Sequence, residues 1–409
     1  MTGGDNAPDA CHLAPLDLIT VERQVQQSGA YSALEWLLDS TMLPYPAYEQ
    51  WRQGGISHLE DAIDADPGAW TRRLHEGESY ARALGLVHEA QTYFDWRPRH
   101  GDRPLSLSPD PGRRELLAQR WVRPVDLSQL DLFLDNGASA AEHDLHRALA
   151  ARNVVDAERI YERLCRIAPN HPGLGEYEGL VLYARHLEQL PAIPPDACAE
   201  EMDGLVQEIL PLARARLRGQ ARDYLAPAWR RLAEGLPRDR FDPEHPDRHA
   251  SHAQMQIPDW EAVMRSVQAV ADHAEHPVLL ARLAQALHHR QCPEAGMLAW
   301  ARCCERTPEA FLADLARDAA PRLYRHALAF EALDEALDPV DFPAWLLLKE
   351  PGLLHHLDRV DTPVPAGASF LAVADLLRTR CSGGDEVVAR RRLQELNPPL
   401  LRLYLARNP

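Results

Sequence analysis

Apolar side chains recur every three or four residues along most of this chain, and proline or glycine ends many of these stretches. In residues 68–84, for example, Trp70 and Leu74 lie one helical turn apart, and Gly85 follows directly. This spacing gathers apolar side chains on one face of an α-helix, whereas a half-buried strand needs strict alternation. Outside the short segment 127–134 no convincing alternation occurs. The sequence therefore predicts an all-α fold.

The N-terminal region, to about residue 121, reads as a small helical domain. Helical spacing, followed by proline or glycine stops, predicts helices over 31–39, 47–53, 57–63, 68–84 and 113–121. Prolines and glycines mixed with charged residues predict a loop over 97–112. This region is thus expected to contain helices and loops only.

A helical hairpin is predicted next. Asn136 and the glycine after it are typical of a turn. Ser139 and Glu142 then have the spacing of a capping box, in which the two side chains satisfy the first free amides of a helix. One helix is therefore predicted over 139–151 and a second over 156–168.

This hairpin resembles a tetratricopeptide (TPR) repeat, a pattern of about 34 residues in which small residues let paired helices approach and an aromatic fills the gap. Ala157, Tyr161 and Pro169 occupy the small, aromatic and proline positions, and Gly179 the small position of a following unit. The resemblance implies stacked helical hairpins that present an extended surface to other proteins.

A second match lies far downstream, in a unit that Pro277 opens. Gly296, Trp300, Cys303 and Pro308 hold its small, aromatic, small and proline positions. The resemblance therefore implies that the repeat architecture extends toward the C-terminus.

Three parts are predicted from these patterns. They are an N-terminal helical domain over 1–121, a linker over 122–138 and a TPR-like helical-repeat domain over 139–409. In the last part, Pro227 is predicted to kink or split a helix over 212–236, because proline cannot donate the backbone hydrogen bond.

The charge of the chain argues against direct nucleic-acid binding. There are 61 acidic residues against 44 basic ones, a formal net charge of −17, whereas phosphate binding needs clustered positive charge. Arg214, Arg218 and Arg222 recur every four residues, and we interpret them as a solvated helix face. Lys349 is the only lysine, and no glycine-rich loop precedes it, which excludes a P-loop. Such arginine-rich, lysine-poor composition is typical of GC-rich bacteria.

The cysteines and the N-terminus point to the cytoplasm. The seven cysteines are irregularly spaced and form no C-x-x-C pair, so neither a disulfide framework nor a zinc ribbon is expected. The start of the chain lacks the basic and apolar regions of a secretory signal. No apolar run of about 18 residues occurs, so no membrane span is expected.

One short segment is unusually apolar for its position. Residues 127–134 read Leu-Ser-Gln-Leu-Asp-Leu-Phe-Leu and lie in the predicted linker. Large apolar side chains are unfavourable in water, so an exposed linker of this composition is costly. Either the segment is buried in this protein, or another protein buries it.

The core of this segment resembles a known protein-binding peptide. Gln129, Leu130, Asp131, Leu132 and Phe133 match, at all five positions, the pentapeptide by which bacterial replication and repair proteins bind the DNA polymerase III sliding clamp (the β clamp). The resemblance implies an extended peptide whose first residue hydrogen-bonds at a pocket rim. It also implies that the last two residues fill a deep apolar pocket, with the second residue as a side contact.

Local packing is the alternative for this segment. Leu127, Leu130, Leu132 and Leu134 would then cover the apolar edge of the first hairpin. The chain would in that case be a general protein-binding scaffold with the peptide buried.

The sequence contains two groups of possible metal ligands. His245, His249 and His252 share one loop with several carboxylates, which would allow a metal-dependent enzyme as a weaker alternative. Their spacing matches no metal motif, and we expect roles in the loop itself. His288 and the residues near Cys303 are expected to be packing residues.

The sequence thus predicts a non-enzymatic adaptor without cofactor or metal. It would bind the sliding clamp through Gln129 to Phe133 and at least one further protein through its helical repeats. DNA repair, replication or defence is the expected setting.

Overall fold

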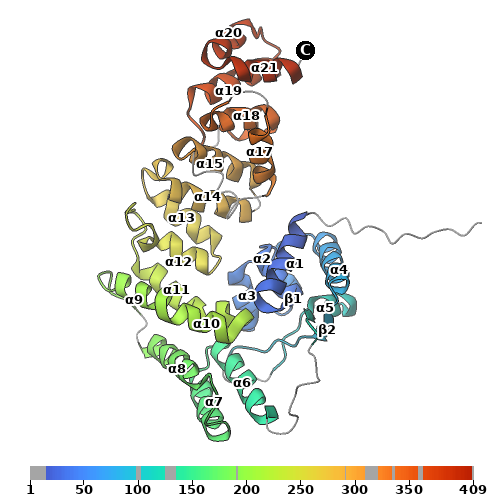
Figure 1. Ribbon diagram of the computed structural model, residues 1–409, viewed down its shortest axis with the longest axis vertical. Helices are drawn as coiled ribbons and strands as arrows, with labels where there is room; N and C mark the ends of the chain where they lie inside the picture. Colours follow the sequence, from blue (N-terminus) through green and yellow to red (C-terminus); the bar gives the residue numbers. More distant parts are fainter. Residues whose placement is uncertain are drawn as a thin grey trace, which may run out of the picture. The chain divides into compact units, whose positions relative to one another are not determined.

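The computed structural model describes residues 15–97, 103–124, 135–189, 192–290, 292–308, 321–333, 337–357 and 363–407. Helices account for nearly all of the regular structure, so the predicted all-α fold is confirmed (Figure 1). The chain divides into two compact units, one of Met1–Gly235 with Gln256–Asp259 and one of Leu236–Met255 with Trp260–Pro409. No described helix has the length and apolar character needed to cross a membrane.

The N-terminal part of the first unit combines short helices with a small sheet. Its elements are α1 Pro15–Ser28, β1 Ala30–Ser32, α2 Ala33–Asp39, α3 Tyr45–Arg52, the 3₁₀ helix η1 Leu59–Ala62, α4 Pro67–Ala83, β2 Val87–Ala90, α5 Pro111–Leu117 and β3 Gln119–Val122. The strands form an antiparallel sheet in the order β1-β3-β2, with Tyr31 and His88 both opposite Trp121.

The expectation that this region lacks strands was wrong. The helix predicted over 31–39 begins only after β1, at the cap residue Ser32, and the helix predicted over 113–121 ends at Leu117, before β3. The strands have three or four residues each. That is too short to display an alternating pattern, and pairing between distant segments stabilises them instead.

The rest of the first unit consists of helices. They are α6 Asp135–Ala150, α7 Val154–Ile167, α8 Leu174–Gln189, α9 Cys198–Gly204, the π-helical turn η3 Leu205–Ile209, α10 Leu210–Leu217, the 3₁₀ turn η4 Arg218–Gln220 and α11 Ala221–Gly235. The predicted boundary at 122–138 lies inside this unit, because the N-terminal elements contact the later helices through a polar network described below.

The predicted hairpin over 139–168 is present as α6 and α7. The backbone amide of Asp156 donates to the side chain of Asn153, which caps α7. Helix α6, however, begins at Asp135, so Ser139 lies inside it and is not its cap. The first turn of a helix tolerates turn-forming residues because its amides have no intrahelical partners.

Pro227 does not split its helix. Helix α11 continues through it, and the interruption lies earlier, at Arg218, whose φ is +48°. The helical stretch predicted over 212–236, with a kink or split at Pro227, is instead divided at Arg218 into α10, η4 and α11.

The second unit is a succession of helices that follow one another in chain order (Figure 1). They are η5 Pro246–Arg248, α12 Ala250–Gln256, α13 Trp260–Ala269, η6 His273–Glu275, α14 Pro277–His289, α15 Pro293–Arg306, α17 Pro321–Glu331, η7 Pro339–Asp341, α18 Phe342–Lys349, η8 Pro351–His356, α19 Ala368–Cys381, α20 Val387–Leu396 and α21 Pro398–Arg407. One continuous apolar core runs through it and includes the buried Trp300, Trp345 and Tyr404.

Helices α14 and α15 approach closely at Gly296. A Cβ at this position would lie 3.0 Å from the carbonyl oxygen of Ala284 and 3.3 Å from the amide nitrogen of His288. Trp300 and Cys303, one and two turns further along α15, are both buried. The small, aromatic and small positions identified in the sequence thus lie in the contact between two paired helices.

We expect Gly296→Val to destabilise the second unit by about 2 kcal/mol, because the added methyl groups would push two helix backbones apart. Gly175→Val is the matched control, since a Cβ at Gly175 in α8 has no neighbour within 4 Å. Urea unfolding should show a loss for the first variant and almost none for the second. Equal stability of both variants would contradict the close approach.

Candidate functional site

The predicted clamp-binding pentapeptide, Gln129 to Phe133, lies in 125–134, outside the described residues. The described residues on either side of it are exposed. Arg123 and Pro124 precede the segment after β3, and Gly137 and Ser139 follow it in α6. The chain therefore lies at the surface of the first unit both before and after this segment.

The histidine loop is held together by its own contacts. His249 is buried, and its two ring nitrogens lie 2.8 Å from the hydroxyl of Ser251 and 3.1 Å from the carbonyl oxygen of Arg238. His252 pairs with Asp247 at 3.1 Å. His245, which is exposed on the same loop, pairs with Asp242 at 3.0 Å.

Arg282 of α14 holds this loop in place through three contacts. It donates to the carbonyl oxygen of Pro246 at 3.0 Å and to Ser251 at 3.1 Å, and it pairs with Asp247 at 3.3 Å. Burial lowers the pKa of Arg282 to about 10, which Asp247 only partly offsets. Across the part of the chain that the structure describes, no three His, Cys, Asp or Glu side chains converge as a metal site would require.

The second group of possible ligands, His289 and the cysteines near it, packs within the second unit. The ring of His289 stacks on that of Trp260 with centroids 4.2 Å apart, and burial lowers its pKa to about 4. The thiols of Cys303 and Cys304 donate to the carbonyl oxygens of Pro277 and Pro339. Burial also raises the pKa of Cys304, so its thiol stays protonated.

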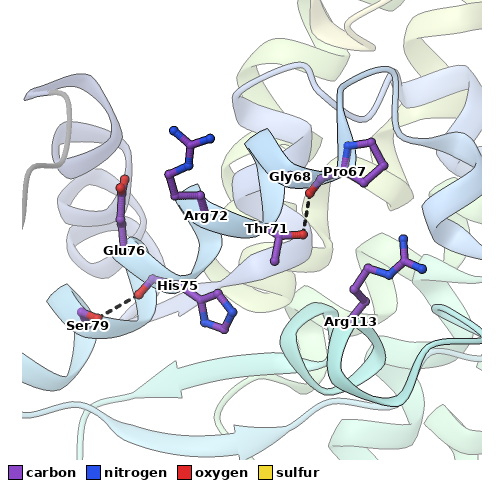
Figure 2. A pocket seen from close by; sticks show the side chains of 8 residues that line it. All are labelled: Pro67, Gly68, Thr71, Arg72, His75, Glu76, Ser79 and Arg113. Atoms are coloured by element: carbon purple, nitrogen blue, oxygen red, sulfur yellow. Dashed lines mark hydrogen bonds between the residues drawn. The ribbon is translucent and has the colours of Figure 1, made fainter.

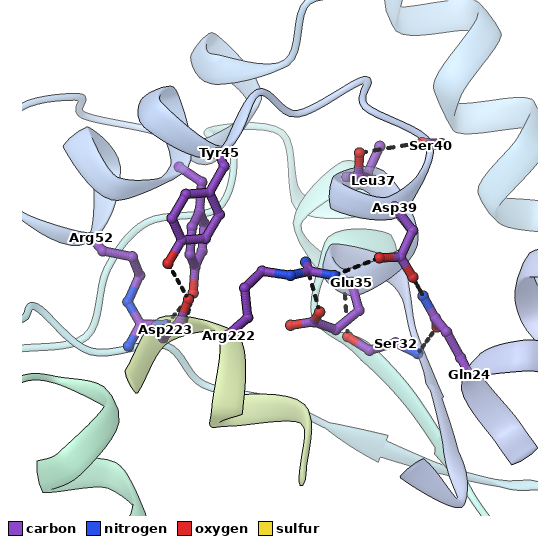
Figure 3. A network of polar contacts seen from close by, with 11 residues as sticks. Gln24, Ser32, Glu35, Leu37, Asp39, Ser40, Tyr45, Arg52, Arg222 and Asp223 are labelled. Carbon is purple, nitrogen blue, oxygen red and sulfur yellow. Dashed lines mark hydrogen bonds and ion pairs between the residues drawn. The ribbon is translucent and has the colours of Figure 1, made fainter. Parts of the chain in front are cut away.

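A network of polar and charged side chains lies in the first unit (Figure 3). Helix α3 contributes Tyr45 and Tyr48, one helical turn apart. Their hydroxyl groups donate to the two carboxylate oxygens of Asp223 in α11, each at 2.9 Å. Burial and the Asp223 charge raise the pKa of both tyrosines, which keeps them protonated as donors.

Pro227 leaves a backbone carbonyl available for a second contact in this network. A proline inside a helix cannot donate to the carbonyl four residues earlier, which here belongs to Asp223. Arg152 donates its Nε to that carbonyl oxygen at 3.3 Å. Arg152 occupies the turn between α6 and α7 with a φ of +60°, a conformation that few residues other than glycine adopt. Pro227 thus leaves the carbonyl oxygen of Asp223 without its helical hydrogen bond, and Arg152 in the strained turn donates to it instead.

Glu49 connects the same helices through two ion pairs. Its carboxylate accepts from Arg152 at 2.6 Å and from Arg230 of α11, and only 7% of the residue is exposed. The guanidinium carbons of Arg52 and Arg152 lie 4.6 and 4.7 Å from the ring centroid of Trp96. Buried charges are thus paired with opposite charges or with an aromatic ring, as burial requires.

Arg222 forms the other end of the network. It pairs with Asp39 at 2.7 Å and with Glu35 at 3.3 Å, both in α2. Gln24 of α1 donates to Asp39 at 2.9 Å (Figure 3). The interpretation of Arg222 as part of a solvated face was wrong, because Arg222 follows the break at Arg218 and faces α2.

Glu35 is the more distant of the two carboxylates that pair with Arg222. The pKa of Glu35 is raised to about 7, mainly by burial; the charge of Arg222 opposes this rise, and the charges of Asp39 and Asp223 add to it. The side chain still keeps 31% of its surface in water, so solvent screens part of this effect. The single positive charge of Arg222 therefore faces more than one negative charge, and the raised pKa of Glu35 reflects this surplus of negative charge in part.

This network joins the N-terminal elements to α11 and to the turn between α6 and α7. Its donors and acceptors face one another, so it is arranged to hold two parts of the unit together. This network was not predicted from the sequence. The available signals were the polar face of α3 that carries Tyr45, Glu49 and Arg52, and an acidic residue four positions before Pro227.

A shallow recess of about 610 Å³ lies between α4 and α5 (Figure 2). Its lining residues are Pro67, Gly68, Thr71, Arg72, His75, Glu76, Ser79 and Arg113. The hydroxyl groups of Thr71 and Ser79 donate to carbonyl oxygens of their own helix, and Arg113 pairs with Glu60 at 3.3 Å. These three polar groups already have partners within the protein, so they are not arranged to receive a ligand.

Comparison with known proteins adds no relative. No protein family, no curated protein and no solved structure matches this chain. Its function must therefore be inferred from its own residues.

Proposed function

We propose that this protein is a cytoplasmic, non-enzymatic adaptor that binds the bacterial DNA sliding clamp through Gln129 to Phe133. Its TPR-like helical hairpins would hold at least one further protein, in DNA repair, replication or defence. The observation that carries the proposal is the five-of-five match to the clamp-binding pentapeptide.

Two features of the described residues support the proposal. The residues that flank the segment, Arg123 and Pro124 on one side and Gly137 and Ser139 on the other, are exposed. The apolar face of α6 is also already covered, since Ala141, Leu145 and Leu149 are buried. A short extended peptide at such a position can reach a pocket on another protein.

The TPR-like label rests on the paired helices themselves. Gly296 allows α14 and α15 to approach, and Trp300, one turn further along α15, is buried. Stacked hairpins of this kind build broad surfaces that suit partner proteins more than small substrates.

Replacing the two anchor residues tests the clamp contact. We expect the full chain to bind purified sliding clamp in calorimetry, and Leu132→Ala with Phe133→Ala to weaken binding more than tenfold, because the anchors lose buried apolar area. Leu127→Ala with Leu134→Ala is the matched control, since it removes two apolar side chains that flank the pentapeptide. Circular dichroism should be unchanged in both.

Two outcomes would contradict the proposal. If the wild-type chain does not bind the clamp, the second candidate takes over, a general helical scaffold in which 127–134 packs on its own protein. If both double variants lose binding equally, the contact is unspecific. The metal-dependent alternative has little support, because His249 and Arg282 tie the histidine loop together.

A further inference from the structure

Exposed apolar side chains concentrate at the C-terminal end of the second unit. Among the described residues, 14 large apolar side chains are exposed, and five of them lie in α19, α20 and α21. These five are Leu371, Val387, Val388, Leu396 and Leu405. Single exposed apolar residues are ordinary, but such a concentration is typical of a surface that contacts another molecule.

One helix face contains the most exposed of them. Leu393 of α20 is buried toward its neighbours, whereas Val387 and Val388 are 57% and 78% exposed. Valine is a weak helix former because its branched side chain loses rotamer freedom in a helix. Two exposed valines at the start of a helix therefore add little to the helix itself, and contact with a partner explains them better.

The α20 outer face, which we define as Val387, Val388, Arg391, Arg392 and Glu395, lies in a basic part of an acidic protein. Residues 368–407 contain seven arginines and four acidic residues, a net charge of +3 in a chain of −17. Arg392 pairs with Asp375 at 3.0 Å, and both side chains are half exposed. Arg391 is exposed and pairs with no carboxylate in the described part of the chain. The face thus combines apolar side chains with an available positive charge.

We propose that the α20 outer face binds an acidic amphipathic helix of a partner protein. An apolar stripe on that helix would cover the two valines, and a carboxylate beside the stripe would pair with Arg391. This inference deepens the proposed adaptor function and rests on it in so far as an adaptor needs a second partner. It specifies the second partner as an acidic amphipathic helix.

Composition argues against a nucleic acid as the occupant. A nucleic acid would leave the two valines without an apolar partner, since phosphates bind through charge.

A synthetic peptide tests the proposal on the full chain. The probe is a labelled 20-residue helix with leucine at every third or fourth position and glutamate on the remaining faces. Two reference peptides carry lysine for glutamate, or serine for leucine. We expect the acidic amphipathic peptide to bind with a Kd on the order of 10–100 µM by fluorescence anisotropy, and several-fold more weakly at high salt.

Paired variants locate the binding surface. Val388→Glu with Arg391→Glu should weaken peptide binding at least tenfold. Val155→Glu with Arg163→Glu, at exposed positions of α7, is the matched control and should bind like the wild type. Leu132→Ala with Phe133→Ala should also bind the peptide normally, which separates this surface from the clamp contact.

Several results would overturn the inference. These are equal binding of all three peptides, no binding of the acidic peptide at millimolar concentration, or equal losses in both glutamate variants. Sedimentation that shows a dimer, dissolved by Val388→Glu with Arg391→Glu, would make a second copy the occupant instead.

Discussion

Asp223→Ala should lower the free energy of unfolding of the first unit by about 3–5 kcal/mol, because it leaves buried partners without their acceptor. Asp223 is only 8% exposed, and both of its carboxylate oxygens accept from tyrosine hydroxyls, of Tyr45 and Tyr48. The positive charges of Arg152 and Arg222 would also lose a neighbouring carboxylate. Urea unfolding, with hydrogen exchange in α3 and α11, measures the loss.

Matched variants separate this network from a general effect of losing a carboxylate. Asp203→Ala, at an exposed position of α9, should change stability by less than about 0.5 kcal/mol. In a background of Tyr45→Phe with Tyr48→Phe, Asp223→Ala should cost much less, because no hydroxyl group is then stranded. If Asp223→Ala behaved like Asp203→Ala, the network would not hold the two parts together.

The stability of the first unit should rise as the pH falls from about 8 to 5, relative to a Glu35→Gln variant. The pKa of Glu35 is about 7 in the folded chain, against 4.5 for an ordinary glutamate. Between these values the folded state binds more protons than the unfolded state, so stability is lost as the pH rises through 7. The full shift corresponds to about 3 kcal/mol. Because the side chain is 31% exposed, solvent screening reduces the expected difference to about 1–2 kcal/mol.

Comparing the wild type with the Glu35→Gln variant separates the effect of Glu35 from that of other titrating groups. His146 and His249 have pKa values lowered by burial, and their protonation destabilises the folded state at low pH in both proteins alike. Glu234→Gln, at an exposed position of α11, is the control and should follow the wild-type profile. A constant difference between wild type and Glu35→Gln across this pH range would refute the surplus-charge account of Arg222.

Local sequence patterns predicted much of the helical framework. The spacing of Trp70 and Leu74 gave α4, and the positions of Pro277, Gly296 and Trp300 gave the α14 and α15 hairpin. These predictions succeeded because helix formation depends on side chains a few residues apart. The strands were not predicted because they depend on pairing between distant segments: β1 pairs with β3 across most of the N-terminal region.

The proposed clamp-binding site is a different case. Gln129 to Phe133 was identified from a motif, and it lies outside the described residues, so it stays a prediction. The α20 outer face was not predicted, because only packing tells which of its residues face neighbouring helices and which face water.

The sequence by itself determined that this chain forms helices, where many of them begin and end, and that it carries a clamp-like pentapeptide. Only the tertiary structure decided that Asp223 meets Tyr45 and Tyr48, and that Arg152 takes the carbonyl freed by Pro227. Helix formation depends on residues close together in the sequence, so the spacing of apolar residues predicts it. Pairing of charges about 180 residues apart is set by packing, because burial alone makes each charge require its particular partner.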